Sequence, residues 1–150
     1  MTAVARVGGR LLLLDPDDRV LLIHERLEFG GTHWLTPGGG VEAGEHPRDA
    51  ALRETIEEVG ISVTLPADAV PVLVTRRDWS WEGIDYDQID HFFLVRVARG
   101  TAVSPQSLTT PEEQTRLGER WWSTEQLRAT AETLVPPDLG EVLSCLLGHG

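Results

Sequence analysis

The feature that most constrains the fold of this chain is a glycine-rich turn that leads directly into a short amphipathic helix. Residues 39–61 read GGVEAGEHPRDAALRETIEEVGI. Proline suits the first turn of a helix and glycine suits its end, so Pro47 and Gly60 predict a helix over about 47–59. Apolar side chains on one face are expected to anchor this helix to a core: Leu52, Ile56 and Val59.

Three carboxylates lie together on another face of the predicted helix: those of Glu54, Glu57 and Glu58. At the spacing i, i+3 and i+4 they project within an arc of roughly 100°. Like charges so close repel one another and destabilise the helix, but Mg²⁺ and Mn²⁺ prefer oxygen ligands and would remove the repulsion. A solvated acidic face is the plain alternative, yet it would not need the preceding glycines 38–40, which allow close approach to the backbone. The pattern therefore favours a divalent-metal site.

The spacing of the fixed residues in this segment resembles the Nudix box of Nudix hydrolases. The pattern is Gly39, five residues, Glu45, seven residues, and then Arg53-Glu54-x-x-Glu57-Glu58-x-Gly60-Ile61. All seven fixed positions match, and Thr55 occupies a position that is usually aliphatic. The resemblance implies an α/β protein with the Nudix fold, an α/β/α sandwich with a mixed β-sheet. It also implies hydrolysis of a pyrophosphate bond in a nucleoside diphosphate linked to another moiety.

The resemblance implies roles for individual residues of the box. Glu57 and Glu58 are expected to be metal ligands for Mg²⁺ or Mn²⁺, with Glu54 as a third ligand or as the base that activates water. The backbone carbonyl of Gly38 matches a family position that contributes a metal ligand. Arg53 is expected to pair with Glu45 and brace the loop against the helix, and it could also meet a phosphate. Gly39 and Gly60 are expected to support this arrangement.

A further acidic ligand outside the box is expected, because many family members take one from another loop. Glu112 and Glu113 lie in a polar segment before the last predicted strand, and both are candidates. Glu113 is included in the predicted metal site. The alternative is that both carboxylates are simply solvated.

Residues for substrate recognition are less well defined by the sequence. Aromatic side chains of one predicted hairpin could stack on a nucleobase, or they could pack on the sheet or at a dimer interface: Trp79, Trp81 and Tyr86. Side chains that could contact phosphate are Arg76, Arg77 and His91. Because adjacent residues of a strand point to opposite faces, Arg76 and Arg77 cannot both enter one pocket. Markers of the family's subgroups do not identify the substrate.

Length and composition limit the class of protein. A chain of 150 residues with 41% hydrophobic content suits one domain over residues 1–150. The net charge of −11 argues against general nucleic-acid binding and leaves a small phosphorylated molecule as the expected partner. No apolar run is long enough to cross a membrane, so a cytoplasmic protein is expected. A homodimer is a further expectation. A Nudix-fold module that binds nucleotides without cleaving them is the alternative to an enzyme.

The remaining elements follow from patterning and turn residues. Strands over 4–14 and 19–26 are expected to form a hairpin around the turn at 15–18, and a short strand is expected at 34–36. Two more strands, over 69–79 and 88–99, are expected to flank an exposed loop at 80–87. The last elements are a polar loop at 101–116, a strand at 118–123, and helices near 124–130 and 139–147.

Overall fold

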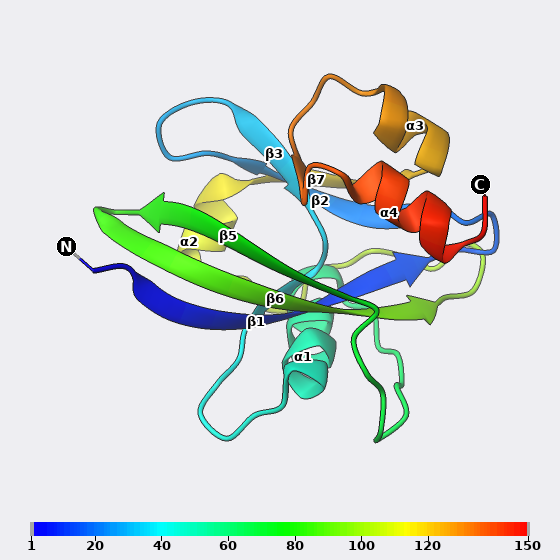
Figure 1. The fold of residues 1–150 in the computed structure, drawn as a ribbon, viewed down its shortest axis with the longest axis horizontal. Coiled ribbons are helices and arrows are strands. Elements are labelled where there is room, and N and C mark those ends of the chain that lie inside the picture. Colours follow the sequence, from blue (N-terminus) through cyan, green and yellow to red (C-terminus); the bar gives the residue numbers. More distant parts are fainter. Residues whose placement is uncertain (1, 150) are drawn as a thin grey trace.

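A mixed β-sheet forms the middle layer of the protein, and helices lie on both of its sides (Figure 1). The computed structural model describes residues 2–149. Within these residues the strands are β1 (Val4–Leu14), β2 (Val20–Arg26), β3 (Thr32–Leu35), β4 (Gly38–Gly40), β5 (Leu73–Trp81), β6 (Ile84–Arg96), β7 (Arg116–Trp122) and β8 (Leu134–Val135). The helices are α1 (Pro47–Val59), α2 (Thr110–Thr115), α3 (Thr124–Ala129) and α4 (Leu139–Leu146). The sheet order is β5-β6-β1-β2-β3-β8, with β4 also paired to β1 and β7 to β2.

Strand β1 shows why the chain forms a sandwich. Successive side chains of a strand point to opposite faces, and four consecutive leucines of β1 are fully buried. Leu11 and Leu13 pack in the core beneath α1, whereas Leu12 and Leu14 pack in the core that includes residues of α3 and α4. A strand that is apolar on both faces needs a covering layer on each side, and the predicted α/β/α sandwich is confirmed.

The expected hairpin of the first two strands is only partly formed. Strand β1 pairs in parallel with β6 along its whole length, from Val4 opposite Tyr86 to Leu14 opposite Arg96. Its antiparallel pairing with β2 is recorded only at Leu14 and Val20, next to the turn. Beyond that point β2 pairs with β3 and β7. Both strands are buried on both faces, so their hydrophobic pattern predicts strands without indicating which strand lies beside which.

The hairpin predicted around residues 80–87 is present, but its loop is shorter than predicted. Strands β5 and β6 continue to a two-residue turn at Glu82 and Gly83, and Trp81 pairs directly with Ile84. Both turn residues have positive φ, 49° and 79°, as hairpin turns that match the twist of the strands require. Cross-strand pairing therefore extends to the tip, as Figure 1 shows at the left.

Helix α1 has the predicted bounds, and two of its three expected anchors, Leu52 and Val59, pack in or against the core, whereas Ile56 does not. Its buried residues include Ala50, Ala51, Thr55 and Val59, whereas Ile56 is 40% exposed. The small side chains allow the helix backbone to approach β1 closely. Gly9 of β1 faces the helix, and a Cβ at this position would collide with the first turn of α1. Close packing by alanines therefore adds to the expected contact through Leu52 and Val59.

Thr55 lies in this tightly packed face, and its hydroxyl has no hydrogen-bond partner among residues 2–149. A buried hydroxyl without a partner lowers stability, because it loses its hydrogen bonds to water. We expect Thr55→Val to raise the free energy of unfolding by about 1 kcal/mol, measured by urea denaturation. The control is Thr64→Val, at an exposed threonine, which should leave the free energy of unfolding nearly unchanged. A lower free energy of unfolding for Thr55→Val would show that the hydroxyl of Thr55 makes a favourable contact.

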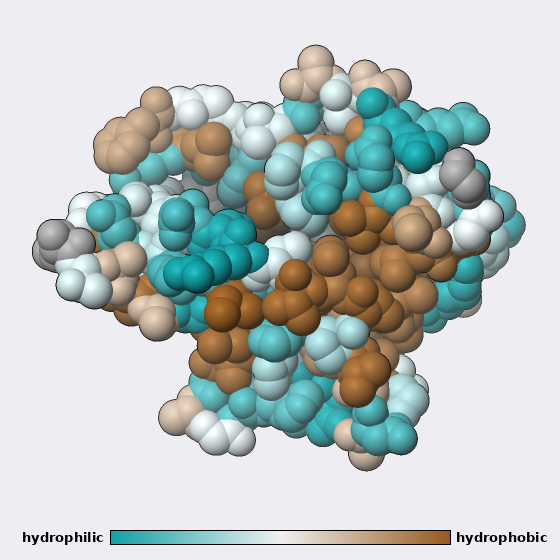
Figure 2. Space-filling view, in the orientation of Figure 1, coloured by the Kyte–Doolittle hydropathy of each residue, from teal (hydrophilic) through white to brown (hydrophobic). Residues whose placement is uncertain are grey.

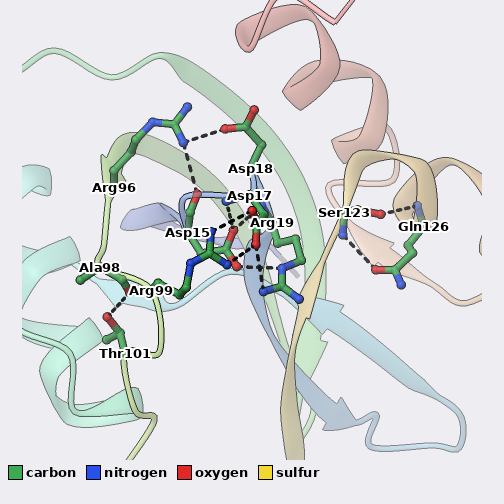
Figure 3. A network of polar contacts seen from close by, with 10 residues as sticks. All are labelled: Asp15, Asp17, Asp18, Arg19, Arg96, Ala98, Arg99, Thr101, Ser123 and Gln126. Atoms are coloured by element: carbon green, nitrogen blue, oxygen red, sulfur yellow. Dashed lines mark hydrogen bonds and ion pairs between the residues drawn. The ribbon is translucent and has the colours of Figure 1, made fainter.

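The turn between β1 and β2 is held by a network of charged groups (Figure 3). A side-chain oxygen of Asp15 accepts the backbone N–H of Asp17 at 3.0 Å. Arg99 pairs with Asp17 at 2.7 Å and Arg96 pairs with Asp18 at 2.6 Å. These arginines lie at and just beyond the end of β6, so the ion pairs fasten the turn to the strand that runs beside β1.

The surface shown in Figure 2 is divided by polarity. Apolar side chains gather near α4 and along the adjoining parts of β5 and β6, while the left part of this face, toward the tip of the β5–β6 hairpin, is more polar. Among the described residues, no helix combines the length and the apolar character that a membrane crossing needs.

Candidate active site

Strand β4 and helix α1 form the floor of the site. The backbone N–H of Gly38 donates a hydrogen bond of 2.7 Å to Oε1 of Glu58, which is 7% exposed. A Cβ at Gly39 would lie 2.5 Å from the carboxyl carbon of Glu54. The glycines therefore let the helix bring two carboxylates directly against the strand, which is the physical reason for glycine at these positions.

A third carboxylate reaches this floor from helix α2. Oxygens of Glu54, Glu58 and Glu112 all lie within 4.8 Å of one another. Helix α2 lies within the segment that was predicted to be an irregular loop. Its position depends on the chain just before it, because the backbone N–H groups of Gln106 and Ser107 donate to the carbonyl of Glu57 near the end of α1. These bonds satisfy a carbonyl that the helix end would leave unpaired.

The electrostatics of the cluster favour a cation. Burial raises the pKa of Glu58 well above its usual range, although the hydrogen bond from Gly38 and the charge of Arg10 oppose the shift. Burial also raises the pKa of Glu54, against the opposing effect of Arg53. Buried carboxylates without a counter-ion are unstable in the charged form. Three converging carboxylates supply the hard oxygen donors that Mg²⁺ and Mn²⁺ prefer, so these residues fit such an ion.

Two residues of the predicted metal site lie outside this cluster. The carboxylate of Glu57 is 37% exposed and lies 3.5 Å from Arg53. Glu113 is exposed and does not line the cavity. Adjacent residues of a helix point in directions about 100° apart, so Glu112 and Glu113 cannot occupy the same place. The structure brings Glu112 to the cluster where the sequence favoured Glu113.

Arg53 and Glu45 form the predicted brace. Nε and Nη2 of Arg53 donate to the two carboxylate oxygens of Glu45 at 2.9 and 3.0 Å. Nη2 also donates to the carbonyl of Gly40, and Nη1 donates to Glu54 at 2.9 Å. The predicted pairing is confirmed, and the guanidinium also orients a carboxylate of the cluster. Gly60 ends the helix as expected, with φ of 70°.

We expect Glu45→Gln to lower the turnover number by about tenfold, because it weakens the group that orients Arg53 and, through it, Glu54. The control is Glu42→Gln, since Glu42 is 70% exposed and lies 3.8 Å from the same guanidinium. Steady-state kinetics should show a loss for Glu45→Gln and almost none for Glu42→Gln. Equal effects of the two changes would contradict the bracing role of Glu45.

A cavity of about 620 Å³ opens above the cluster. Its acidic side carries Glu54, Glu58 and Glu112, and another part of its wall carries basic and aromatic side chains of β1, β5 and β6: Arg6, Arg10, Arg77, Trp79, Trp81 and Tyr86. At one rim of the cavity the turn between β5 and β6 contacts the loop between β2 and β3, because the carboxylate of Glu28 accepts the backbone N–H of Glu82 at 2.6 Å.

The predicted separation of Arg76 and Arg77 is confirmed. Arg77 lines the cavity, whereas Arg76 is exposed and pairs with Asp87 at 2.5 Å. His91, the other candidate for a phosphate contact, is absent from the lining. Trp79 and Tyr86 stack on each other with ring centroids 4.3 Å apart, so each already has one face covered.

A buried ion cluster that lies next to the cavity was not predicted from the sequence. Asp90 is 1% exposed and lies 3.2 Å from Nε of Arg10 and 3.1 Å from Nε of Arg77. Gln88 donates to the same carboxylate at 2.6 Å and accepts from the indole of Trp79 at 2.8 Å. The sequence does contain one indication of this cluster, because Arg10 directly precedes four leucines and is a charged residue within an apolar strand.

Comparison with known proteins agrees with the fold and the box. A family model described as the NUDIX domain matches residues 5–144. The chain therefore belongs to the Nudix family, and it is a Nudix hydrolase. It is 27% identical over 136 residues to Nudix hydrolase 25 of Arabidopsis thaliana, covering 84% of this chain and 77% of that protein. It is 42% identical over 67 residues to an RNA pyrophosphohydrolase of Cereibacter sphaeroides, covering 40% of this chain and only 39% of that protein.

Solved structures share the whole architecture. A Nudix-family hydrolase from Clostridium perfringens matches with a TM-score of 0.68 at 23% identity, covering 94% of this chain and 97% of that chain. The Ap4A hydrolase of C. elegans, in a binary complex, matches with a TM-score of 0.67 at 19% identity, covering 97% and 99%. At these identities the likeness establishes the fold, and the predicted Nudix fold is confirmed.

Proposed function

We propose that this Nudix hydrolase cleaves a pyrophosphate bond in a nucleoside diphosphate linked to another moiety, with Mg²⁺ or Mn²⁺ as cofactor. The observation that carries the proposal is the convergence of Glu54, Glu58 and Glu112 within 4.8 Å at one side of a cavity. One relative, 42% identical over 67 residues, is named an RNA pyrophosphohydrolase. That name agrees with the proposed cleavage of a pyrophosphate bond. The substrate is a small molecule in this proposal, and the chain acts as one domain.

The residues that would hold the cation are the three carboxylates, with the carbonyl of Gly38 beside them. When bound, the cation supplies neutralisation of phosphate charge and makes a nearby water more acidic. Glu58 is fixed by the N–H of Gly38, so its carboxylate keeps one orientation. Glu54 is oriented by Arg53, and in this proposal its carboxylate either serves as the third ligand or accepts the proton of the attacking water. Most of the rate enhancement then comes from positioning and electrostatics, as in other phosphoryl transfers.

A phosphate-release screen tests the proposal. Nucleoside triphosphates, nucleotide sugars, dinucleoside polyphosphates and dinucleotide cofactors are incubated with the protein, with and without Mg²⁺ or Mn²⁺. Released phosphate is measured after treatment with inorganic pyrophosphatase for the triphosphates and with phosphatase for the other classes, whose phosphates are exposed only by cleavage. We expect turnover of at least one class only when a divalent cation is present. Binding of a nucleotide without turnover under any of these conditions would instead identify a non-catalytic sensor and overturn the proposal.

A further inference from the structure

Arg6 is a cationic group in the wall of the cavity with no acidic partner. Among residues 2–149 no ion pair or side-chain hydrogen bond of its guanidinium is found, although the chain carries many ion pairs elsewhere. The guanidinium lies 5.4 Å from the ring centroid of Trp79 and 5.9 Å from that of Tyr86. It lies in the same cavity as the acidic cluster. In a protein with a net charge of −11, an arginine left unpaired in a cavity favours an anionic ligand.

The arginine is held in place rather than left to move freely. The indole of Trp79 is fixed by its hydrogen bond to Gln88, which in turn bonds to buried Asp90. The guanidinium also lies close to Gly40, where an added Cβ would come within 2.8 Å of its Nη2. Glycine at this position therefore leaves the space that the arginine occupies. A cation packed against an aromatic pair and a glycine is preorganised to bind an anion.

Arg77 adds a second positive charge to this wall. Its Nε is bonded to Asp90, and the same carboxylate also serves Arg10. Arg10 is balanced further by the nearby charges of Glu58 and Glu25, so the positive charge of this wall that stays without an acidic partner among residues 2–149 is that of Arg6. Arg77 also lies over the ring of Trp79, at 5.5 Å from its centroid. This set of residues, called the basic wall below, consists of Arg6, Arg77, Trp79 and Tyr86.

We propose that the basic wall binds phosphate groups that extend beyond the bond being cleaved, so that the enzyme prefers substrates with three or more consecutive phosphates over those with two. The inference rests on the proposed function and deepens it. The acidic cluster and its cation serve the scissile pyrophosphate, and the surplus positive charge of the wall is matched by additional phosphates. A nucleotide sugar or a dinucleotide cofactor, with only two phosphates, leaves part of that charge unmatched.

Binding of two inorganic probes tests this directly. Imidodiphosphate and imidotriphosphate, in which NH replaces the bridging oxygens, are titrated by calorimetry into the protein in the presence of Mg²⁺. For Arg6→Gln we expect the affinity for imidotriphosphate to fall by about tenfold or more, as loss of a charged hydrogen bond predicts, and the affinity for imidodiphosphate to fall much less. Arg6→Lys keeps the charge and should recover most of the loss.

The matched control is Arg120→Gln. Arg120 also lies over an aromatic ring, 3.7 Å from the centroid of Trp122, but it does not line the cavity. It should leave both affinities unchanged. Equal losses for the two probes in Arg6→Gln, or no loss for either, would overturn the inference and show that Arg6 only packs on the aromatic pair. Metal-dependent hydrolysis by the wild type with equal efficiency on two-phosphate and three-phosphate substrates would also overturn it, while leaving the proposed function intact.

Discussion

Glu112→Gln should reduce turnover by more than about 100-fold, whereas Glu113→Gln should leave it nearly unchanged. Changes to groups that only support metal ligands typically cost 10- to 100-fold, so loss of a ligand itself should cost more. The two glutamates are neighbours in α2, yet only Glu112 joins the acidic cluster. Steady-state kinetics at saturating Mg²⁺, on a substrate found by the screen, measures the difference.

This pair of variants separates a role in the site from a role in folding. The carboxylate of Glu112 also accepts the backbone N–H of Thr109 at 2.8 Å as part of a capping box. Glutamine can make the same capping bond, so the helix should form in the variant, and circular dichroism should confirm it. Similar turnover for Glu112→Gln and Glu113→Gln would show that the third carboxylate takes no part in catalysis.

Asp90→Asn should lower the free energy of unfolding by about 3 kcal/mol or more. Removing one partner of a buried ion pair leaves an uncompensated charge, and such changes cost about 3–5 kcal/mol. Here one carboxylate, 1% exposed, pairs with two arginines, so its loss removes the ion-pair partner of both Arg10 and Arg77, and only the charges of Glu58 and Glu25 still act on Arg10. Urea denaturation with a common slope for both proteins measures the change.

The control for this prediction is Asp87→Asn in the same strand. Asp87 also pairs with an arginine of β5, but that arginine, Arg76, has a side chain that is 71% exposed, and exposed pairs contribute little. Its unfolding midpoint should stay close to that of the wild type. If the two variants are equally stable, the buried cluster does not stabilise the fold.

The same cluster predicts a pH dependence. Burial alone would raise the pKa of Asp90, but the charges of Arg10 and Arg77 outweigh it and hold the pKa below its usual value. A carboxylate whose pKa is lowered on folding stabilises the protein above its unfolded pKa of about 3.9, and this contribution is lost as the pH falls through the lower, folded value. The stability difference between the wild type and Asp90→Asn should therefore shrink as the pH falls below about 4.

Local patterns were sufficient to predict much of the fold. The start and end of α1 follow from Pro47 and Gly60, and the pairing of Arg53 with Glu45 follows from the resemblance to the family motif. Strand pairing could not be predicted in this way. Strands β1 and β2 are apolar on both faces, and such a strand can pair with any neighbour of similar length without changing which side chains are buried.

The third carboxylate and the basic wall depend on contacts between distant segments. Glu112 reaches the cluster because the backbone at Gln106 and Ser107 bonds to the end of α1, and main-chain hydrogen bonds leave no signal in side-chain pattern. Arg6 and Arg77 line the same cavity because β1 and β5 both lie next to β6 in the sheet. The sequence predicted that Arg76 and Arg77 point to opposite faces, but only the sheet order shows which of them enters the cavity.

Binding of Mn²⁺ is the most direct test of the acidic cluster as the metal site. Titration monitored by electron paramagnetic resonance compares the wild type with Glu58→Gln, Glu112→Gln and Glu113→Gln, each checked for folding by circular dichroism. We expect the wild type and Glu113→Gln to bind the ion with the same affinity, and Glu58→Gln and Glu112→Gln to bind it at least about tenfold more weakly. Identical affinities in all four proteins, or no binding by the wild type even when a nucleotide is added, would contradict the assignment.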